Sequence, residues 1–503
     1  MEPTGSLPAG LERSVRLHAG RIAISAAGTD TTYTDLWARA TSFAGWLRAA
    51  DVGPGDRVAL ALEGCWQYVA AYYGALIAGA IVVPLNAAAR LGELTQWTQH
   101  ARARVVVGDE QLLNLKQLSA ELPDETRVLG ACGPGGSFEK ACQGVPQRLE
   151  AGLLEPGRPA CIHYTSGTTG APKGVLLSHG NLASNAVAII GYLALDQTDS
   201  VVTVLPFYYA YGASVLHTHL LVGGRVIVEK GFSFPHLVFE RIALEGASGF
   251  AGVPSTFALL LSRVRLDSYD LGNLRYVTQA GGGMPPALTR RLIDALPGKQ
   301  IYVMYGQTEA TSRLTYVPPE RLQEKLGAAG LPLAGVDIEI RDEERRPCGR
   351  GEVGRVWVRG PNVMLGYWRS PDATATVLHD EWLDTGDVGY VDGDGYLFLS
   401  GRRSDIIKVG AHRVHPQDVE AAIAEFPGVA EVAVAGIDDP LLGEVVKAFV
   451  VAAPGFAPSE QAIRRHCLER LAAYKVPRKV ALVASLPRTA SGKVRRQDLV
   501  NRE

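Results

Sequence analysis

Short apolar runs alternate with longer stretches of helical periodicity through most of the chain. Residues 57–61 form one such run, and a helical pattern and further apolar runs follow it up to residue 107. The block 160–335 repeats this order, with strand-like runs at 201–205 and 225–228. In its first helical pattern, one face carries Leu182, Ala186, Ile189, Ile190 and Leu193. Strands that alternate with helices are typical of parallel sheets, so the pattern predicts an α/β fold.

The pattern changes further along the chain. Residues 337–341 alternate like a strand of a smaller antiparallel sheet, and residues 390–399 predict a hairpin. A boundary falls at residues 401–405, and residues 406–503 have the helix and strand pattern of a compact α+β unit. We therefore predict a large N-terminal domain, residues 1–400, with parallel-type α/β sheets plus a small antiparallel sheet, and a small C-terminal domain.

Three other segments allow more than one interpretation. Residues 118–158 lack a sustained period and predict a connector on the surface. Residues 69–85 are apolar but short for a membrane span, which favours a core helix followed by a strand. His217 and His219 would share one face of a strand, but no third metal ligand lies nearby in the sequence. Packed histidines are therefore favoured over a metal site.

Composition excludes several classes of function. The chain has 503 residues and a net charge of -2, which gives no general attraction to nucleic acid or to an anionic membrane. Its six cysteines are scattered without a Cys-x-x-Cys pair, which favours reduced thiols over a disulfide framework or a zinc site. The N-terminus lacks the pattern of a secretory signal. We expect a cytoplasmic protein with no nucleic-acid partner and no membrane span.

The stretch Tyr164-Thr-Ser-Gly-Thr-Thr-Gly-Ala-Pro-Lys-Gly174 concentrates hydroxyl groups and glycines between two apolar runs. Glycines let a loop turn its backbone N–H groups inward, which makes an anion-binding concavity. The common phosphate loop G-x-x-x-x-G-K-[ST] has a different spacing and leads into a helix. A flexible surface loop is the alternative, but a proline and a lysine between two strands favour polyphosphate binding. The expected contacts are Thr165, Ser166, Gly167, Thr168, Thr169, Gly170 and Lys173.

This stretch closely resembles the signature loop of the adenylate-forming superfamily, which includes acyl-CoA and aryl-CoA synthetases, luciferase and peptide-synthetase adenylation domains. Five further segments resemble superfamily motifs in the same order and cover almost the whole chain. The resemblance implies ATP-dependent activation of a small carboxylic acid to an acyl-adenylate, with release of pyrophosphate. The acyl group would then pass to the thiol of CoA. The alternatives are phosphopantetheine on a carrier protein, an amine acceptor, or a relative that binds nucleotide without turnover.

Two glycine-containing segments resemble the adenine and metal motifs of this superfamily. Residues 303–309, Val-Met-Tyr-Gly-Gln-Thr-Glu, match its Y-G-x-T-E box. The resemblance implies that Tyr305 stacks on adenine, Thr308 bonds phosphate and Glu309 holds Mg²⁺. Magnesium commonly takes one or two carboxylates together with phosphate oxygens. The resemblance also assigns Gly281, Gly282 and Gly306 to the ATP site.

Three later segments resemble the ribose, hinge and catalytic-lysine motifs. Asp387 ends the segment Trp-Leu-Asp-Thr-Gly-Asp and would bind the ribose hydroxyls. Arg402 would contact ribose or phosphate, and Ser404 stands at the hinge, where the family usually has Asp or Lys. Gly410 would line the thiol channel after the small domain rotates. Lys493, in Pro-Arg-Thr-Ala-Ser-Gly-Lys, would neutralise charge on the acyl carboxylate and the α-phosphate as pyrophosphate leaves.

The resemblance assigns the acyl pocket to aromatic and glycine residues. Its expected lining is Tyr208, Tyr209, Tyr211, Gly252 and Gly283, although each tyrosine could equally be part of the core. Residues 206–214 contain no acidic residue that could pair with a substrate ammonium group. This absence favours an uncharged aryl or alkyl acid over an α-amino acid. Oligomeric state is left open, with a homodimer as one option.

Overall fold

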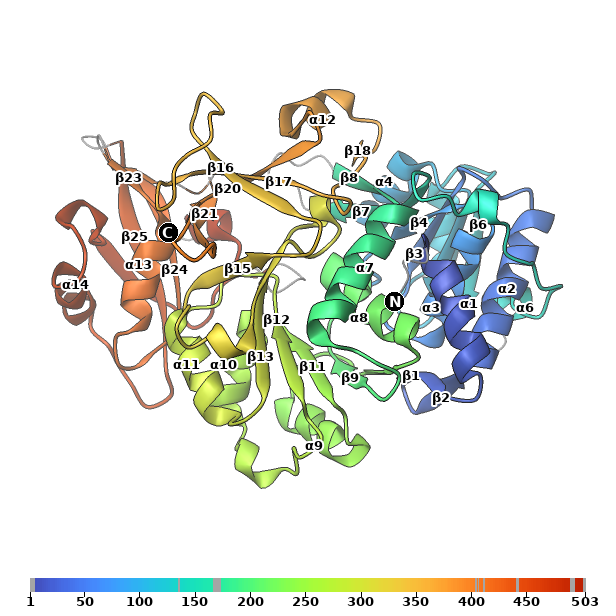
Figure 1. Ribbon diagram of the computed structural model, residues 1–503, viewed down its shortest axis with the longest axis horizontal. Helices are drawn as coiled ribbons and strands as arrows, with labels where there is room; N and C mark the ends of the chain where they lie inside the picture. The colour runs from blue at the N-terminus through green and yellow to red at the C-terminus, as the bar shows by residue number, and fades with distance from the viewer. Residues whose placement is uncertain are drawn as a thin grey trace.

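The computed structural model describes residues 5–133, 136–165, 173–402, 405, 407–409, 412–439, 443–488 and 494–500. Its strands form a first sheet near the N-terminus, a large second sheet, and a separate C-terminal sheet. Figure 1 shows the C-terminal elements, in orange and red, at one side of the large sheet. The N-terminal elements, in blue, lie at the opposite side.

The first sheet has the strand order β18-β8-β7-β4-β3-β5-β6. These strands are β3 (Arg57–Ala61), β4 (Ile81–Pro84), β5 (Val105–Asp109), β6 (Arg127–Ala131), β7 (Pro159–Thr165), β8 (Lys173–Ser178) and β18 (Gly366–Tyr367). Strands β3 to β7 pair in parallel, whereas β8 and β18 are antiparallel. This arrangement confirms the predicted α/β class.

The second sheet begins with a parallel part, continues into an antiparallel part, and includes β19 beside β20. The parallel part comprises β1 (Ile22–Ala26), β9 (Ser200–Thr203), β10 (Arg225–Val228), β11 (Gly249–Gly252), β12 (Tyr276–Gln279) and β13 (Gln300–Tyr305). The antiparallel part comprises β14 (Thr315–Val317), β15 (Ala328–Pro332), β16 (Asp337–Arg341), β17 (Gly354–Arg359), β19 (Leu378–His379), β20 (Trp382–Val391) and β21 (Leu397–Arg402); β2 (Thr29–Thr32) lies at the opposite edge. The predicted small antiparallel sheet is therefore joined to the large one through β15.

Both faces of the parallel part are buried, because helices cover each of them. Successive side chains of a strand point to opposite faces and so enter two different cores. One face packs against helices α1 (Leu7–His18), α2 (Tyr33–Ala49), α3 (Trp66–Ile77), α7 (His179–Leu193) and α8 (Ala210–Val222). The other face packs against α9 (Pro235–Glu245), α10 (Pro254–Arg263) and α11 (Pro286–Ala295). Val201 belongs to the first core and Val202 to the second, and Tyr276 and Val277 divide in the same way.

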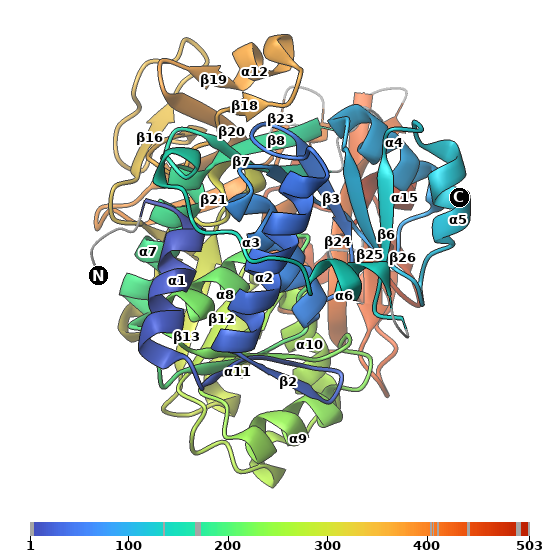
Figure 2. The same cartoon turned by 90° about the vertical axis from the view of Figure 1, so that its right-hand side faces the viewer.

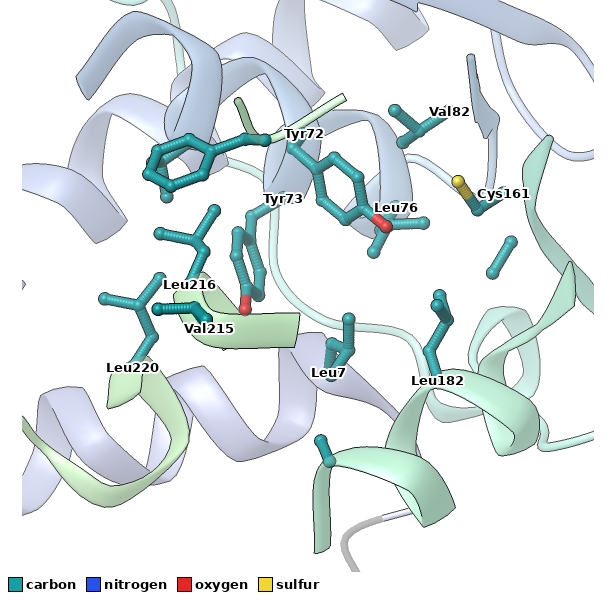
Figure 3. Packing of buried hydrophobic residues seen from close by; sticks show 14 of the residues in the cluster. Leu7, Tyr72, Tyr73, Leu76, Val82, Cys161, Leu182, Val215, Leu216 and Leu220 are labelled. Carbon is teal, nitrogen blue, oxygen red and sulfur yellow. The ribbon is translucent and has the colours of Figure 1, made fainter. Parts of the chain in front are cut away.

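The helices of the first face also cover the first sheet, so they form a shared layer between the two sheets. Tyr72 and Leu76 of α3 and Leu216 of α8 join the same core as Val82 and Cys161 of the first sheet. Figure 3 shows these side chains packed together, and Figure 2 shows α1, α2 and α3 side by side over the sheets. Helix α4 (Leu91–Ala101) and α5 (Leu115–Glu121) cover the outer face of the first sheet.

The C-terminal sheet has its own hydrophobic core. Its elements are β22 (Ile407–Val409), β23 (His412–Val414), β24 (Val429–Asp439), β25 (Gly443–Ala452), β26 (Lys479–Leu482), α13 (Pro416–Ala424), α14 (Glu460–Leu468) and α15 (Arg496–Val500). Val419, Val434, Ala448 and Ile463 are fully buried within this unit. The structure thus has the predicted large N-terminal unit and a smaller C-terminal one.

One sequence-based prediction is wrong and another is confirmed. Residues 118–158 are not only a surface connector, because they contain β6 and α6 (Ser137–Ala141). Strand β6 lies at the sheet edge and only part of it is buried, which explains its weak periodicity. Residues 69–85 form part of α3 and then β4, as predicted. Within the described part of the chain, no helix combines the length and apolar character needed to cross a membrane.

His217 and His219 lie on helix α8, not on a strand, and both are buried. Nδ1 of His217 is 3.1 Å from the hydroxyl of Tyr73, and Nε2 of His219 is 2.7 Å from the hydroxyl of Tyr276. Burial lowers the pKa of His217 to about 3 and that of His219 to about 4. Both are therefore packed, neutral histidines, which was the favoured interpretation.

We predict that His217→Gln makes stability less sensitive to acid. Between about pH 6.5 and pH 3 the unfolded chain binds a proton at His217 that the folded chain excludes, so wild-type stability falls as pH falls. A glutamine side chain binds no such proton and can still bond Tyr73. Around pH 5, the free energy of unfolding of the variant should fall by ~1.4 kcal/mol less per pH unit of acidification than that of the wild type. Urea unfolding across this range measures the slope. Exposed His236→Gln is the control, and equal slopes for His217→Gln and wild type would contradict the prediction.

Candidate active site

The predicted phosphate loop is bracketed by two paired strands. Thr165 ends β7 and Lys173 begins β8, and the two residues face each other in antiparallel register. The predicted contacts Ser166, Gly167, Thr168, Thr169 and Gly170 lie outside the described residues. The Lys173 ammonium is 5.5 Å from the ring centroid of Tyr367. The structure therefore places the lysine of this loop beside an aromatic ring on β18, the edge strand that pairs with β8.

Tyr305, Asp387 and Arg402 form one hydrogen-bonded group at strand ends. Tyr305 is the last residue of β13, and its hydroxyl donates to Oδ2 of Asp387 at 2.5 Å. Arg402 ends β21 directly across from Asp387 in register, and its Nε lies 3.3 Å from Oδ1 of Asp387. The Asp387 carboxylate raises the pKa of Arg402, and Glu309 raises it further. This group therefore combines a nearly buried carboxylate with one half-exposed cation.

Glu309 lies beside this group, in the short helix η3 (Thr308–Ala310) that follows β13. The hydroxyl of Tyr367 donates to Oε1 of Glu309 at 2.9 Å, and the backbone N–H of Met364 donates to the Glu309 carbonyl at 2.9 Å. Burial, together with Glu309, raises the pKa of Tyr367. Tyr367 thus connects Lys173 on one side with Glu309 on the other.

The chain after Glu309 makes a strained turn that the sequence did not reveal. Thr311 has φ +68°, an outlier for a β-branched residue, and Ser312 N–H donates to the Ala310 carbonyl at 2.7 Å. The buried amide of Asn362 donates to the carbonyls of Ala310 and Arg313, and the Thr311 hydroxyl donates to the Asn362 carbonyl. Such strain persists only where neighbours hold the chain in place. Asn362 therefore positions the segment that carries Glu309.

The glycines of the predicted adenine site have distinct geometries. Gly306 lies against the backbone of Ser312, so any Cβ at Gly306 would clash with that backbone. Gly281, two residues after the end of β12, has φ +85°, which L-residues rarely adopt. The carbonyl of Gly282 accepts from the side-chain amide of buried Gln279 at 2.9 Å. The chain therefore makes a close backbone approach after β13 and a turn that favours glycine after β12.

The tyrosines of the predicted acyl pocket are divided between two settings. Tyr208 and Tyr209 are half-buried before α8, with ring centroids 4.4 Å apart. Tyr211 is buried, and its hydroxyl donates to the Thr278 carbonyl at 2.8 Å. Burial raises the pKa of Tyr211 to about 12. Gly252 ends β11 next to β12, and Gly283 has open space where a Cβ would stand.

Three predicted residues of the C-terminal part, Ser404, Gly410 and Lys493, lie outside the described residues. Near them, Arg496 of α15 pairs with Asp405 at 3.1 Å and with Glu420 of α13 at 2.8 Å. The described site therefore consists of residues from the N-terminal unit. Among the described residues, no group of three or more His, Cys, Asp or Glu side chains could hold a metal ion.

Comparison with protein families matches both parts of the chain. The model of the AMP-binding enzyme family matches residues 11–368, and that of the AMP-binding enzyme C-terminal domain matches residues 418–493. A feruloyl-CoA synthase from Amycolatopsis is 36% identical over 485 residues, 96% of each chain. A 2-succinylbenzoate–CoA ligase from Geobacillus kaustophilus is 34% identical over 501 residues, covering 98% of this chain and 97% of the relative.

Solved structures resemble the whole chain. The anthranilate CoA ligase AuaEII in complex with anthranoyl-AMP has a TM-score of 0.92 at 28% identity, covering 99% of this chain and 96% of its own. ATP-bound MatB from Rhodopseudomonas palustris has a TM-score of 0.90 at 31% identity, covering 99% and 98%. The o-succinylbenzoate CoA synthetase MenE from Bacillus subtilis, with ATP and magnesium, has a TM-score of 0.84 at 28% identity, covering 97% and 98%.

We predict that Asn362→Ala destabilises the segment after Glu309. The substitution removes one of the two donors to each of the buried carbonyls of Ala310 and Arg313, which keep the Ser312 N–H and the Asn185 amide, and the loss of these two hydrogen bonds costs ~1–3 kcal/mol. Urea unfolding should show a lower midpoint, and hydrogen exchange at the Ser312 amide should become faster. The control is Asn273→Ala, because Asn273 is exposed. An unchanged midpoint together with unchanged exchange at Ser312 would show that Asn362 does not hold the turn.

Proposed function

The chain belongs to the AMP-binding enzyme family, and from this premise we propose which of its residues carry each step and which acids it accepts. It is an acid–thiol ligase. A carboxylate oxygen attacks the α-phosphorus of ATP, and the bond to pyrophosphate breaks to leave an acyl-adenylate. The thiol of CoA then attacks the acyl carbon and AMP leaves. Such catalysis depends on positioning and charge neutralisation, because the phosphates carry the developing charge.

The observation that carries the residue assignments is a series of interactions that runs from Lys173 to Asp387, in which Glu309 and Arg402 are linked by charge and not by a direct contact. Lys173 lies over Tyr367, Tyr367 bonds Glu309, and the charge of Glu309 acts on Arg402, which pairs with Asp387. This arrangement brings together three segments that are far apart in the sequence. They are the loop that ends at Lys173, which suits a polyphosphate, Glu309, which suits a metal ion, and Asp387, which suits a sugar. That combination fits a nucleoside triphosphate.

We assign the nucleoside to the end of β13 and β20. Asp387 would accept hydrogen bonds from the two ribose hydroxyls, as a carboxylate can do. Tyr305 and Arg402 bond Asp387 and would orient it. We assign the flat adenine ring to the backbone beside Gly281, Gly282 and Gly306, where no side chain projects.

The phosphates would lie between the loop and η3. Thr165 and Lys173 at the ends of the loop would contact the phosphate oxygens, as would Ser166, Gly167, Thr168, Thr169 and Gly170. Thr308 begins η3 next to Glu309 and would add a hydroxyl donor. Lys173 would provide the fixed positive charge on this side of the site.

The donor set fits Mg²⁺. Glu309 offers one carboxylate, and the described residues add no further cluster of ligands. Magnesium is commonly held in this way, by one or two carboxylates together with substrate phosphates and water. When bound there, the ion would compensate phosphate charge. Tyr367 would hold the Glu309 carboxylate in place through its hydrogen bond.

We propose that the C-terminal unit moves between the two half-reactions. The proposed bounds are residues 1–400 for the N-terminal domain, 401–405 for the hinge and 406–503 for the mobile domain. Lys493 would face the acyl carboxylate and the α-phosphate during adenylation. After rotation about Ser404, Gly410 would line the channel for the incoming thiol. The small domain has its own hydrophobic core, which supports movement as a unit.

The substrate we propose is an aryl or apolar acid and not an α-amino acid. Tyr208 and Tyr209 would provide an aromatic wall, Gly283 leaves open space, and residues 206–214 have no carboxylate for a substrate ammonium group. Gly252 would contribute backbone to the lining, because Thr256 and Phe257 fill the space of its missing side chain. The feruloyl-CoA synthase and the anthranilate CoA ligase are named for aryl acids, which supports this class. Those names also support CoA as the acceptor.

The decisive test of this function is exchange of labelled pyrophosphate into ATP, followed by thioester formation. Aryl acids should support both reactions with Mg²⁺ and CoA, whereas free α-amino acids should support neither. A holo carrier protein replaces CoA in a parallel reaction. If no acid stimulates pyrophosphate exchange, the protein would be a relative that binds nucleotide without turnover. Thioester formation only on the carrier protein would change the proposed acceptor.

We predict that Glu309→Gln lowers pyrophosphate exchange by ~100-fold or more, because it removes a negatively charged Mg²⁺ ligand from the phosphates. Raising the Mg²⁺ concentration should recover part of the activity. Exposed Glu320→Gln is the matched control and should behave like the wild type. Circular dichroism checks that the fold is retained. Near-normal exchange with an unchanged Mg²⁺ dependence would remove Glu309 from the metal site.

We predict that Lys493→Ala and Ser404→Pro separate the two half-reactions. Lys493→Ala should slow adenylation ~100-fold but spare thioester formation from supplied acyl-adenylate. If the protein rests in the adenylation arrangement, Ser404→Pro should spare adenylation and slow thioester formation, because proline restricts the hinge backbone. Single-turnover assays of each half-reaction measure both effects, with exposed Lys116→Ala as control. Equal slowing of both steps by Lys493→Ala would contradict the rotation mechanism.

A further inference from the structure

Two half-buried thiols face each other where helix α3 begins. The Sγ atoms of Cys65 and Cys132 lie 3.8 Å apart, although 67 residues separate the two cysteines along the chain. A disulfide joins its sulfurs at ~2.0 Å, so a relative shift of ~1.8 Å would bring these two within bonding distance. The sequence alone did not indicate this pair, because the fold brings together segments that are distant in the chain.

Cys65 is the residue that caps the N-terminus of α3. Its sulfur accepts a hydrogen bond from the backbone N–H of Tyr68 at 3.5 Å, and the positive end of the helix dipole lies at the same place. Both features favour negative charge on the sulfur, and the thiolate is the form of cysteine that reacts with oxidants. Cys65 is therefore the member of the pair that is arranged to react first.

Cys132 is held beside Cys65 in a strained conformation just after β6. Its φ is +66°, in the left-handed region that L-residues other than Asn and Asp rarely adopt. Its N–H donates to Oε1 of Glu139 at 3.1 Å, and its carbonyl accepts from the side-chain amide of Gln111 at 2.6 Å. The hydrogen bond with Cys65, followed by burial, raises the pKa of the Cys132 thiol. Cys132 is therefore the protonated partner, fixed next to the reactive sulfur.

The segments that carry the two thiols already pack against each other. The ring centroids of Trp66 and Phe138 are 6.3 Å apart, and the side-chain amide of Gln67 donates to Glu139 at 3.0 Å. Helix α3 is buried along most of its length, whereas β6 lies at the sheet edge and is partly exposed. A bond between the sulfurs would therefore need only a small movement of the sheet edge and of the first turn of α3.

The start of α3 also supports the segment that leads into α8. The hydroxyl of Tyr68 donates to the Phe207 carbonyl at 2.9 Å. Gly64, which precedes Cys65, lies so close to the Phe207 ring that a Cβ on Gly64 would come within 3.3 Å of it. Tyr208 and Tyr209 of the proposed acyl pocket follow Phe207 directly. A movement at the start of α3 would therefore reach the proposed acyl pocket through Phe207.

We propose that Cys65 and Cys132 are a redox modification site, at which a peroxide forms a reversible disulfide, and that this bond slows activation of the acid through the contacts of α3 with Phe207. Formation of the bond does not depend on the proposed function. Its effect on the acid rests on the proposed function, so the two parts are measured separately.

The chemistry takes two steps and consumes one peroxide. The Cys65 sulfur attacks a peroxide oxygen, the O–O bond breaks, and Cys65 becomes a sulfenic acid as the first water leaves. The Cys132 sulfur then attacks the Cys65 sulfur, the S–O bond breaks, and a second water leaves with the Cys132 proton. The two thiols are oxidised to one disulfide and the peroxide is reduced to two waters. A dithiol reductant reverses the result.

The first experiment detects the bond. The reduced protein is treated with hydrogen peroxide, free thiols are blocked with N-ethylmaleimide, and peptides are analysed by mass spectrometry without reduction. The wild type should yield a linked peptide of Cys65 and Cys132 that dithiothreitol separates, whereas Cys65→Ser should not. Cys348→Ser is the matched control, because Cys348 is also half-buried, and it should still form the link. Absence of this linked peptide from the wild type would overturn the inference.

The second experiment measures the effect of the bond on pyrophosphate exchange with an aryl acid. After peroxide treatment, kcat/KM for the acid should fall by ~10-fold in the wild type, because a small displacement of a positioning segment is costly to catalysis. The KM for ATP should stay unchanged, and dithiothreitol should restore activity. Cys65→Ser should be active and insensitive to peroxide, since serine is a favourable helix cap in place of cysteine.

The outcomes separate this inference from the proposed function. An equal fall in Cys65→Ser and the wild type would show that peroxide acts elsewhere, which overturns the effect assigned to the bond. A linked peptide with unchanged kinetics would overturn that effect as well, while leaving acid activation intact. If no acid stimulates exchange in the reduced wild type, the proposed function fails and the effect on the acid fails with it. The peptide analysis would still decide whether the bond forms.

Discussion

The constraint on which this structure depends is the burial of both faces of its parallel strands. Successive side chains of a strand point to opposite faces, and helices cover each face, so the strand interiors can carry only apolar or fully bonded residues. Val201 and Val202, like Tyr276 and Val277, divide between the two cores. Polar chemistry is thereby confined to the strand ends. Thr165, Gln279 and Tyr305 are each the last residue of a strand that pairs in parallel, whereas Asp387 lies within antiparallel β20.

Strand ends alone would leave these groups separate, and the antiparallel part of the second sheet brings them together. The pairing of β20 with β21 sets Asp387 opposite Arg402, and the Tyr305 hydroxyl bonds the same carboxylate. Strand β18 returns to pair with β8, which brings Tyr367 between Lys173 and Glu309. Through Tyr367, strand β18 thus links Lys173 of the first sheet to Glu309, which follows β13 of the second sheet.

The strained turn at Thr311 lies between Glu309, the proposed metal ligand, and buried Arg313. Asn362 holds the carbonyls on both sides of the turn, so Glu309 before it and Arg313 after it have fixed positions relative to one another. Backbone strain of this kind is stored at sites where geometry must be exact enough for catalysis, and its cost is met by the surrounding hydrogen bonds. Buried Arg313 extends this rigid unit toward the ring of Tyr211.

Much of the architecture was predictable because it depends on local patterns. The face of α7 that carries Leu182, Ala186 and Ile189 is buried as its period required, and the C-terminal unit has its own core. Motif spacing likewise indicated the family and the identities of Glu309, Asp387 and Lys173 before any contact was known. By contrast, edge strand β6 was missed because a half-exposed strand has a weak period, and His217 was considered on a strand although it lies on a helix. By itself the sequence determined the fold class, the family and the residue types of the site. Only the tertiary structure showed that Asn362 and Tyr367 contact the segment of Glu309, because hydrogen bonds arise between segments whose separation along the chain carries no signal.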